Sequence, residues 1–264
     1  MERIDPKDNP YLRVLFYGDP GSTKTRTSST AVFDDRTYPT LMLGAANNPL
    51  AIRDYKKLPD IIKLETVKDL NDPYDWLQRG QPKDDPLVKA MDLHPPYKCV
   101  IIDGITEIQR FSFNAQTGAV KLGPGDFPEK ATYNHFGMVL GQMIQMARYY
   151  LDLPMHVILT SLEKQDKDEV TGLIKYAPLL WGQSDKEVGG YAYVVGRLMH
   201  LSMMADRSQK LMELADATTT SVALFKPSAK YVAKDQYGVL GDFMVNPSIP
   251  KILELVFGGH ETKS

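Results

Sequence analysis

The sequence predicts an α/β protein with a central, mostly parallel β-sheet flanked by helices. Short apolar runs of strand length alternate with segments of helical spacing, as expected when crossover helices join parallel strands. The runs at 98–103 and 155–162 are continuously apolar and end in polar residues, which is typical of central strands buried on both faces. A strand-like run at 12–17 also leads directly into a glycine-bearing loop and a helix-compatible stretch.

Composition sets limits on the class of protein. The 264 residues, of which 43% are hydrophobic and 24% charged, predict a single globular domain over 1–264 with a flexible arm at 1–10. No apolar run approaches the roughly 20 residues of a membrane span, so we expect a cytoplasmic protein without membrane contact. The lone cysteine, Cys99, predicts a packed thiol. The net charge of -2 shows no basic footprint, so any DNA binding must depend on local loops or an oligomer.

The first half of the chain gives these elements in order. After the strand at 12–17, the stretch 26–33 is compatible with a helix and 40–43 reads as a second strand. A third strand is expected at 61–64, near an edge of the sheet. Five prolines punctuate 66–97 and predict short helices and loops there.

The second half continues the pattern. We expect, in order, the strand at 98–103, a helix at 105–114, a long loop at 117–130, a helix at 133–151 and the strand at 155–162. The polar run from Glu163 predicts a second long loop that reaches about Lys186. Alternation from Gly196 onward predicts a C-terminal β-hairpin turning at 206–209, and 252–257 closes the chain as a short helix.

The loop after the first strand matches the phosphate-binding pattern at its first glycine, its lysine and its threonine. Its residues are Gly18, Asp19, Pro20, Gly21, Ser22, Thr23, Lys24 and Thr25, followed by Arg26. Such a loop points backbone N–H groups at phosphates, its lysine reaches the β and γ phosphates, and its hydroxyl ligates Mg²⁺. Thr23 departs from the pattern, because a glycine usually precedes the lysine, and its side chain is expected to crowd the phosphates. The loop therefore predicts a site for ATP and Mg²⁺, rather than an ordinary strand-to-helix turn.

Further polar residues follow the two central strands. Asp103 has the placement of the acidic residue that holds Mg²⁺, and with Thr25 it forms the predicted metal pair. Thr160 and Ser161 end the next strand, where a hydroxyl can sense the γ-phosphate. Helix capping or loop hydrogen bonding explains these two hydroxyls equally well.

The order of the motifs GDPGSTKT, KCVIIDGITEI, MHVILTSLEK, YAPLLWG, YVVGRLMHL and YVAKDQYG resembles the phage-encoded RecA-like P-loop ATP-binding proteins, including the core-only single-strand annealing recombinases. The resemblance covers about residues 11–257. It implies a RecA-like ATPase core that assembles into rings or filaments, with ATP at subunit boundaries and DNA-contacting loops facing the centre. It also implies the cytoplasm of a bacterial host, and phage or host recombination proteins as partners.

By position, the DNA-contacting loops of the resemblance are 116–130 and 164–186. They contain Lys121, Lys130, Lys164, Lys167, Lys175 and Lys186, with Tyr176 and Trp181 available to stack on bases. Acidic residues are interleaved with these cations, so solvated loop charges and a packed Trp181 form the alternative interpretation.

The resemblance also implies a water-activating glutamate just after the second strand, where this sequence has Ala46 and Asn47. Glu107 and Glu163 are the available substitutes, and the loss of the usual carboxylate predicts slow hydrolysis. In such assemblies a cation of one subunit reaches the γ-phosphate bound by its neighbour. Lys234 is the first candidate for that role and Lys230 the second, although both read equally well as surface lysines.

We therefore expect an ATPase that acts as an oligomer on single-stranded DNA in recombination or replication, through annealing or strand exchange. The rival hypothesis is a nucleotide-switched interaction protein that never touches DNA, which the acidic balance and the missing glutamate favour. A small-metabolite kinase fits less well, because no arginine-rich lid is found in the sequence.

Overall fold

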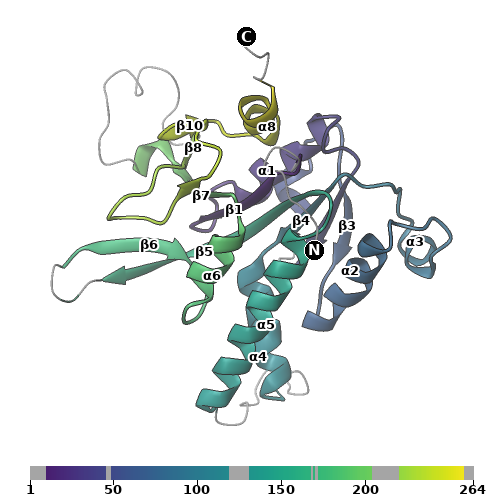
Figure 1. Ribbon diagram of the computed structural model, residues 1–264, viewed down its shortest axis with the longest axis horizontal. Coiled ribbons are helices and arrows are strands. Elements are labelled where there is room, and N and C mark those ends of the chain that lie inside the picture. The colour runs from purple at the N-terminus through teal and green to yellow at the C-terminus, as the bar shows by residue number, and fades with distance from the viewer. Residues whose placement is uncertain are drawn as a thin grey trace, which may run out of the picture.

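A ten-stranded sheet forms the centre of the computed structural model, which describes residues 10–45, 49–118, 131–167, 169, 172–203 and 220–258 (Figure 1). Its order is β10-β8-β7-β1-β5-β4-β2-β3, with β6 paired to β5 and β9 to β7. The strands are β1 (Arg13–Gly18), β2 (Thr40–Gly44), β3 (Asp60–Lys63), β4 (Cys99–Asp103), β5 (His156–Lys167), β6 (Ile174–Pro178), β7 (Val194–His200), β8 (Ser221–Leu224), β9 (Lys234–Asp235) and β10 (Phe243–Val245).

The six strands from β7 to β3 in this order run parallel. Strand β5 lies between β1 and β4, so the carboxyl ends of these three strands meet at one edge of the sheet. The predicted edge strand is confirmed as β3. The predicted C-terminal hairpin is confirmed by the antiparallel pairing of β7 with β8, although its turn at 206–209 lies outside the described residues.

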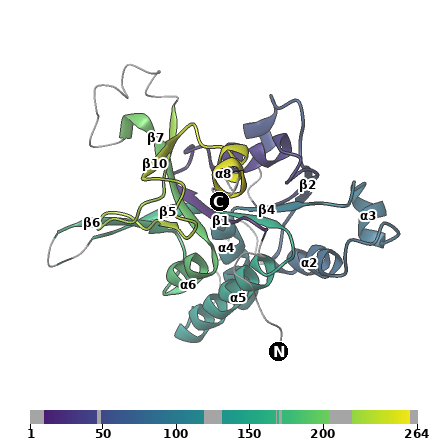
Figure 2. The same cartoon turned by 45° about the horizontal axis from the view of Figure 1, so that its top comes forward.

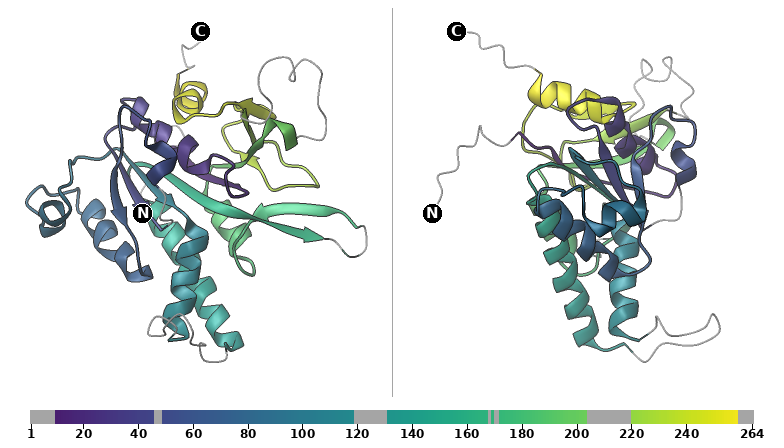
Figure 3. Two further views of the ribbon diagram at one scale, coloured as in Figure 1. Left: turned by 180° about the vertical axis from the view of Figure 1, so that it is seen from behind. Right: turned by 90° about the vertical axis from the view of Figure 1, so that its right-hand side faces the viewer.

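Helices cover both faces of the sheet. They are α1 (Lys24–Ser29), α2 (Asn71–Gln78), α3 (Pro86–Met91), α4 (Ile105–Gln116), α5 (Tyr133–Leu151), α6 (Ser184–Tyr191) and α8 (Ile249–Phe257), with short 3₁₀ turns η2 (Thr30–Phe33), η3 (Pro49–Ile52), η4 (Val67–Leu70) and η6 (Leu201–Met203). Figure 3 shows α1 and α8 on one face and α4 and α5 on the other. Among the described residues, no helix is long and apolar enough to cross a membrane.

Two apolar clusters pack against the two faces of the sheet. Because successive side chains of a strand point to opposite faces, Leu15 and Tyr17 of β1 join the cluster under α4 and α5, whereas Val14 and Phe16 join the one under α8. Cys99 is fully buried in the second cluster, which raises the pKa of its thiol far above the usual range. It is the packed thiol that the sequence predicts.

The long loop predicted from Glu163 to about Lys186 is wrong. Strand β5 runs on to Lys167 and pairs with β6 as an antiparallel hairpin, and α6 follows. Figures 1 and 2 show this hairpin extending away from the body as a two-stranded arm. A polar run at the tip of an arm has no core to face, so the apolar periodicity that marks other strands is missing here.

Several predictions lie outside the described residues. They are most of the N-terminal arm, the loop at 119–130 with Lys121 and Lys130, and the positions Ala46 and Asn47 of the missing glutamate.

Candidate nucleotide site

The loop at 18–25 lies at the carboxyl edge of the sheet, between β1 and α1. A Cβ atom at Gly18 would lie 2.2 Å from the carbonyl oxygen of Leu198 in β7, so only glycine allows the loop to start this close to β7. The loop then turns through Gly21 at φ 81°, with the N–H of Ser22 donating to the carbonyl oxygen of Asp19 at 3.1 Å.

Thr23 adopts the left-handed conformation that a glycine would adopt freely. Its φ is 67° and its ψ is 15°, and this conformation costs an L-residue roughly 1–2 kcal/mol. Its hydroxyl lies 3.4 Å from that of Thr27, one turn along α1. The departure from the usual pattern is therefore accommodated by backbone strain within the loop.

The ammonium group of Lys24 folds back onto its own loop. It donates to the carbonyl oxygens of Gly18 and Asp19, both at 2.8 Å, and lies 3.3 Å from the hydroxyl of Ser22. Burial lowers the pKa of Lys24 from 10.5 to about 8, against the opposing influence of nearby carboxylates. Within the part of the chain that the structure describes, no carboxylate forms an ion pair with this ammonium group.

Asp103 connects the predicted metal pair and the predicted phosphate sensor. The hydroxyl of Thr25 donates to Oδ2 of Asp103 at 2.8 Å, and the hydroxyl of Thr160 donates to Oδ1 at 2.6 Å. The backbone N–H of Gly104 in turn donates to the Thr160 hydroxyl at 2.8 Å. Asp103 is only 5% exposed, so these bonds fix its carboxylate at the foot of the loop.

Ser161 does not join this group. Neighbouring residues of a strand face opposite sides, and the Ser161 hydroxyl donates to the carbonyl oxygen of Leu162 at 2.9 Å and lies 3.1 Å from the hydroxyl of Thr106. These contacts match the alternative interpretation of Ser161, in which its hydroxyl makes local hydrogen bonds and does not sense phosphate.

The two substitute carboxylates are both held by arginines. Glu163 accepts bonds of 2.6 and 3.0 Å from Arg197, and the two side chains are only 1% and 8% exposed. Glu107, in the first turn of α4, pairs with Arg110 at the surface. Arg197 also lies 3.7 Å from the ring centre of Tyr176, which fastens β7 to the base of the arm.

Lys234 lies away from the loop. Its ammonium group donates to the carbonyl oxygens of Ala192 at 2.7 Å and Gly190 at 2.9 Å, at the end of α6. Lys226 pairs with Asp242, and Lys230 is exposed. Each contact is within the chain, and a role towards a neighbouring subunit stays a prediction.

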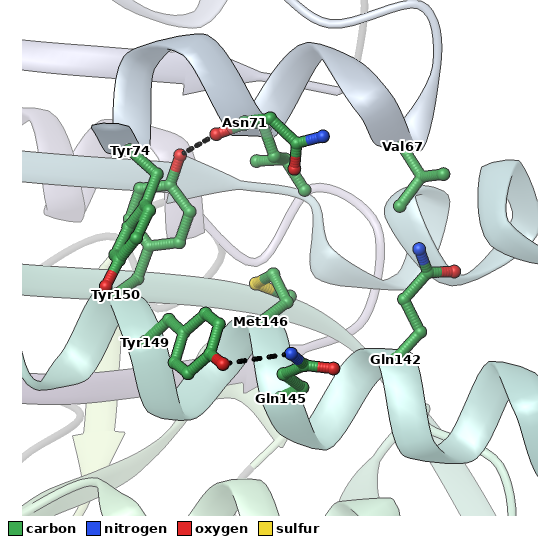
Figure 4. Close-up of a pocket in the computed structure, with 9 residues that line it drawn as sticks. Val67, Asn71, Tyr74, Gln142, Gln145, Met146, Tyr149 and Tyr150 are labelled. Carbon is green, nitrogen blue, oxygen red and sulfur yellow. Dashed lines mark hydrogen bonds between the residues drawn. The ribbon is translucent and has the colours of Figure 1, made fainter. Parts of the chain in front are cut away.

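An open pocket of about 250 Å³ lies against the loop, lined by residues 21–26 and Ala51. Arg26 borders it, bonded to both carboxylate oxygens of Asp54 at 2.8 and 2.9 Å and packed on the ring of Tyr55. A second pocket of about 200 Å³ lies between η4, α2 and α5, and Figure 4 shows its lining of tyrosines, amides and apolar side chains. This second lining contains no cation, so the first of these two pockets is the one that suits a phosphate group.

Sequence reasoning missed the contacts of four residues in or near the site. Arg197 could be noticed as an arginine inside an apolar strand, but its partner Glu163 lies 34 residues away in the sequence. Asp54 and Tyr55, from a segment without any motif, hold Arg26, which lines the pocket. His200, whose ring contacts the loop at Gly21, gave no signal at all.

The sequence matches the model of the AAA domain family over residues 11–237, and the chain therefore belongs to this family of P-loop ATPases. Its fold, with a mostly parallel sheet between helices, is the α/β architecture that the sequence predicts. No curated protein compared with the sequence matches it.

Solved structures that are similar to this chain have low sequence identity to it. A KaiC-like protein of the archaeon Pyrococcus horikoshii OT3 is 13% identical, with 90% of each chain covered and a TM-score of 0.40. A DnaB-like replicative helicase, solved in a study of its interactions with primase, is 12% identical, with 86% of this chain and 53% of the helicase covered and a TM-score of 0.43. A third solved structure, an ATPase domain, is 13% identical, with 94% of this chain and 85% of that domain covered and a TM-score of 0.42.

Proposed function

We propose that the chain binds ATP with Mg²⁺ at the loop 18–25. One observation carries this proposal: the hydroxyl of Thr25 donates to Asp103, 78 positions away in the sequence, at 2.8 Å. This contact joins the two elements that a phosphate loop and its metal require, and Lys24 lies beside them with only neutral oxygens as partners. A partly buried cation without a carboxylate partner suits a triphosphate.

The residues fit this ligand in separate roles. Lys24 would bind phosphate oxygens, while Thr25 and Asp103 would hold Mg²⁺, which offsets phosphate charge when bound. Thr160 fixes the orientation of the Asp103 carboxylate through its 2.6 Å bond. Arg26 would form a side wall of the pocket, with the ring of Tyr55 packed behind it.

We propose that hydrolysis is slow. Glu163 has both oxygens bonded to Arg197 and is almost fully buried, so it cannot orient a water molecule in this arrangement. Glu107 is the better candidate base, because its pair with Arg110 is partly exposed, and such pairs are worth only about 0–1 kcal/mol.

We further propose that the protein assembles into rings or filaments and acts on single-stranded DNA in recombination or replication, in the cytoplasm of a bacterial host of a phage. The support is the β5–β6 arm, which extends away from the body (Figure 1) and contains the exposed residues Lys167 and Lys175.

Two side chains, each held by contacts within the chain, favour the alternative, a nucleotide-switched protein-interaction ATPase without DNA binding. Lys164 is already paired with Asp166 and Asp185, at 3.3 and 3.1 Å. Trp181 packs edge-on against Phe113, with ring centres 5.1 Å apart, instead of standing free for a base. The segment 164–186 therefore offers DNA fewer groups than its sequence predicted.

The test is ATP hydrolysis with and without single-stranded DNA over a series of salt concentrations, with Asp103→Asn as the matched control. We expect slow turnover that DNA stimulates, with the stimulation falling as salt rises. Turnover should be nearly absent in Asp103→Asn, because the acidic partner of the metal is lost. Equal rates in the two proteins would contradict the nucleotide site. Turnover that requires Asp103 yet ignores DNA would support the protein-interaction alternative.

A further inference from the structure

Strand β7 contacts the phosphate-binding loop at a second point, beyond Gly18. Nε2 of His200, the last residue of β7, lies 3.1 Å from the carbonyl oxygen of Gly21. Because a carbonyl oxygen only accepts hydrogen bonds, Nε2 carries the hydrogen and donates it. The ring of His200 thus fastens the middle of the loop to the sheet.

The other ring nitrogen has no such role. Nδ1 of His200 is buried, and within the described residues it has no hydrogen-bond partner. An unsatisfied buried polar atom costs free energy, so the position of the ring is not explained by its own hydrogen-bonding needs. The hydrogen bond from Nε2 to Gly21 is therefore the contact that accounts for the position of the ring.

The loop needs an external support at this place. Two residues after Gly21, Thr23 is held at φ 67°, which glycine adopts freely and threonine does not. Left alone, a loop with threonine at this position favours conformations with negative φ, which would redirect Lys24 and Thr25. A hydrogen bond of ordinary net strength is of the size needed to offset much of that strain.

We propose that His200 is a positioning residue of the nucleotide site, which holds the phosphate-binding loop in the conformation that Thr23 disfavours. The inference rests on the proposed binding of ATP at this loop. When only a fraction of the protein has the competent loop, the apparent dissociation constant rises by the inverse of that fraction. His200 therefore acts on nucleotide affinity through the population of the competent loop.

A double-mutant cycle between positions 23 and 200 tests the proposal, with ATP affinity measured by calorimetry. We expect His200→Ala to weaken ATP binding about threefold to tenfold. His200→Gln, which can keep an N–H donor near the Nε2 position, should stay within about twofold of the natural protein. In the Thr23→Gly background the loss from His200→Ala should shrink to less than about twofold, because glycine removes the strain.

The kinetic readout separates positioning from general damage. His200→Ala should raise KM and leave kcat nearly unchanged, because the competent fraction has an intact site. His94→Ala is the control, since His94 is 72% exposed and pairs with Asp60 at the start of β3. If His200→Ala does not fold, His200→Leu replaces it, as a side chain of similar bulk without a donor.

Three outcomes overturn the proposal or its basis, and they are distinguishable. An unchanged affinity in the folded His200 variants overturns the positioning role. An equal loss with Thr23 and with Gly at position 23 shows that His200 does not compensate strain. Absence of ATP binding in the natural protein overturns the proposed function itself.

Discussion

Two places at the carboxyl edge of the sheet hold a cation in different ways. At the loop, Lys24 is bonded to backbone carbonyl oxygens and faces an open pocket. At the base of the arm, Arg197 is bonded to both oxygens of Glu163 and covered by Tyr176. Within the described residues, Lys24 has no carboxylate partner, whereas Arg197 is paired with Glu163.

The difference appears in the pKa values. Burial dominates at Lys24 and lowers its pKa to about 8. Burial also acts on Arg197, but the hydrogen bonds and charge of Glu163 outweigh it and raise the pKa of the guanidinium. A cation whose charge is disfavoured by its own protein is suited to receive an anion, whereas a matched pair stabilises the fold.

Lys24→Ala has the largest expected effect and tests whether the cation at the loop binds phosphate. We expect ATP binding to weaken by at least about 100-fold, because a charged donor to the phosphates is lost. The free energy of unfolding at pH 7 should be unchanged or higher, because the removed charge is partly desolvated in the folded state. Calorimetric titration and thermal unfolding measure the two effects, and an unchanged ATP affinity would exclude the loop as the phosphate site.

At the base of the arm we expect the reverse, a loss of stability with little change in ATP affinity. Arg197→Met leaves the Glu163 carboxylate buried without its partner, which should cost about 3–5 kcal/mol in the free energy of unfolding. ATP affinity, measured at a temperature where the variant is folded, should change little. Lys63→Met is the matched control, because its pair with Glu65 is exposed and worth about 0–1 kcal/mol. A loss no larger than that of the control would show that the buried pair is not structural.

The pH dependence sharpens the comparison further. The folded pKa of Lys24, about 8, lies below its value of 10.5 in the unfolded chain, so the unfolded chain holds the extra proton between these values. The contribution of Lys24 to stability is therefore least favourable below pH 8 and becomes less unfavourable as the pH rises towards 10.5. Bound phosphate restores the charge, so ATP binding near pH 8.5 should take up protons, by up to about one per site. Titrations in buffers of different ionisation enthalpy measure this uptake, which Lys24→Ala should abolish.

The sequence predicted those parts of the site that depend on the order of motifs and strands along the chain. Gly18, Lys24 and Thr25 follow one strand and Asp103 ends another, so their convergence follows from parallel topology. Sequence could not reveal that Glu163 is neutralised by Arg197, because that contact depends on how β5 and β7 flank β1. The arm was missed for a related reason, since its strands pair with each other beyond the core and carry no apolar pattern. Thr23 and His200 show the same limit, because strain and its support are properties of folded geometry.

The smallest expected effect belongs to Lys234, which extends the comparison to a third cation. Its ammonium group donates to carbonyl oxygens at the end of α6, and burial lowers its pKa. As a helix cap it is worth about 1 kcal/mol, so Lys234→Ala should reduce stability by that amount through loss of the carbonyl contacts. As the predicted cation reaching a neighbour's phosphate, it would have to leave these carbonyls in the oligomer.

The two roles of Lys234 give different results on mixing subunits. If Lys234 acts across a subunit boundary, ATP hydrolysis per subunit falls on dilution, and Lys24→Ala mixed with Lys234→Ala recovers part of the activity. That recovery is expected because some boundaries then pair an intact loop with an intact lysine. If Lys234→Ala alone hydrolyses ATP at the natural rate while losing about 1 kcal/mol of stability, the lysine caps α6 and the neighbour's phosphate is reached by another group.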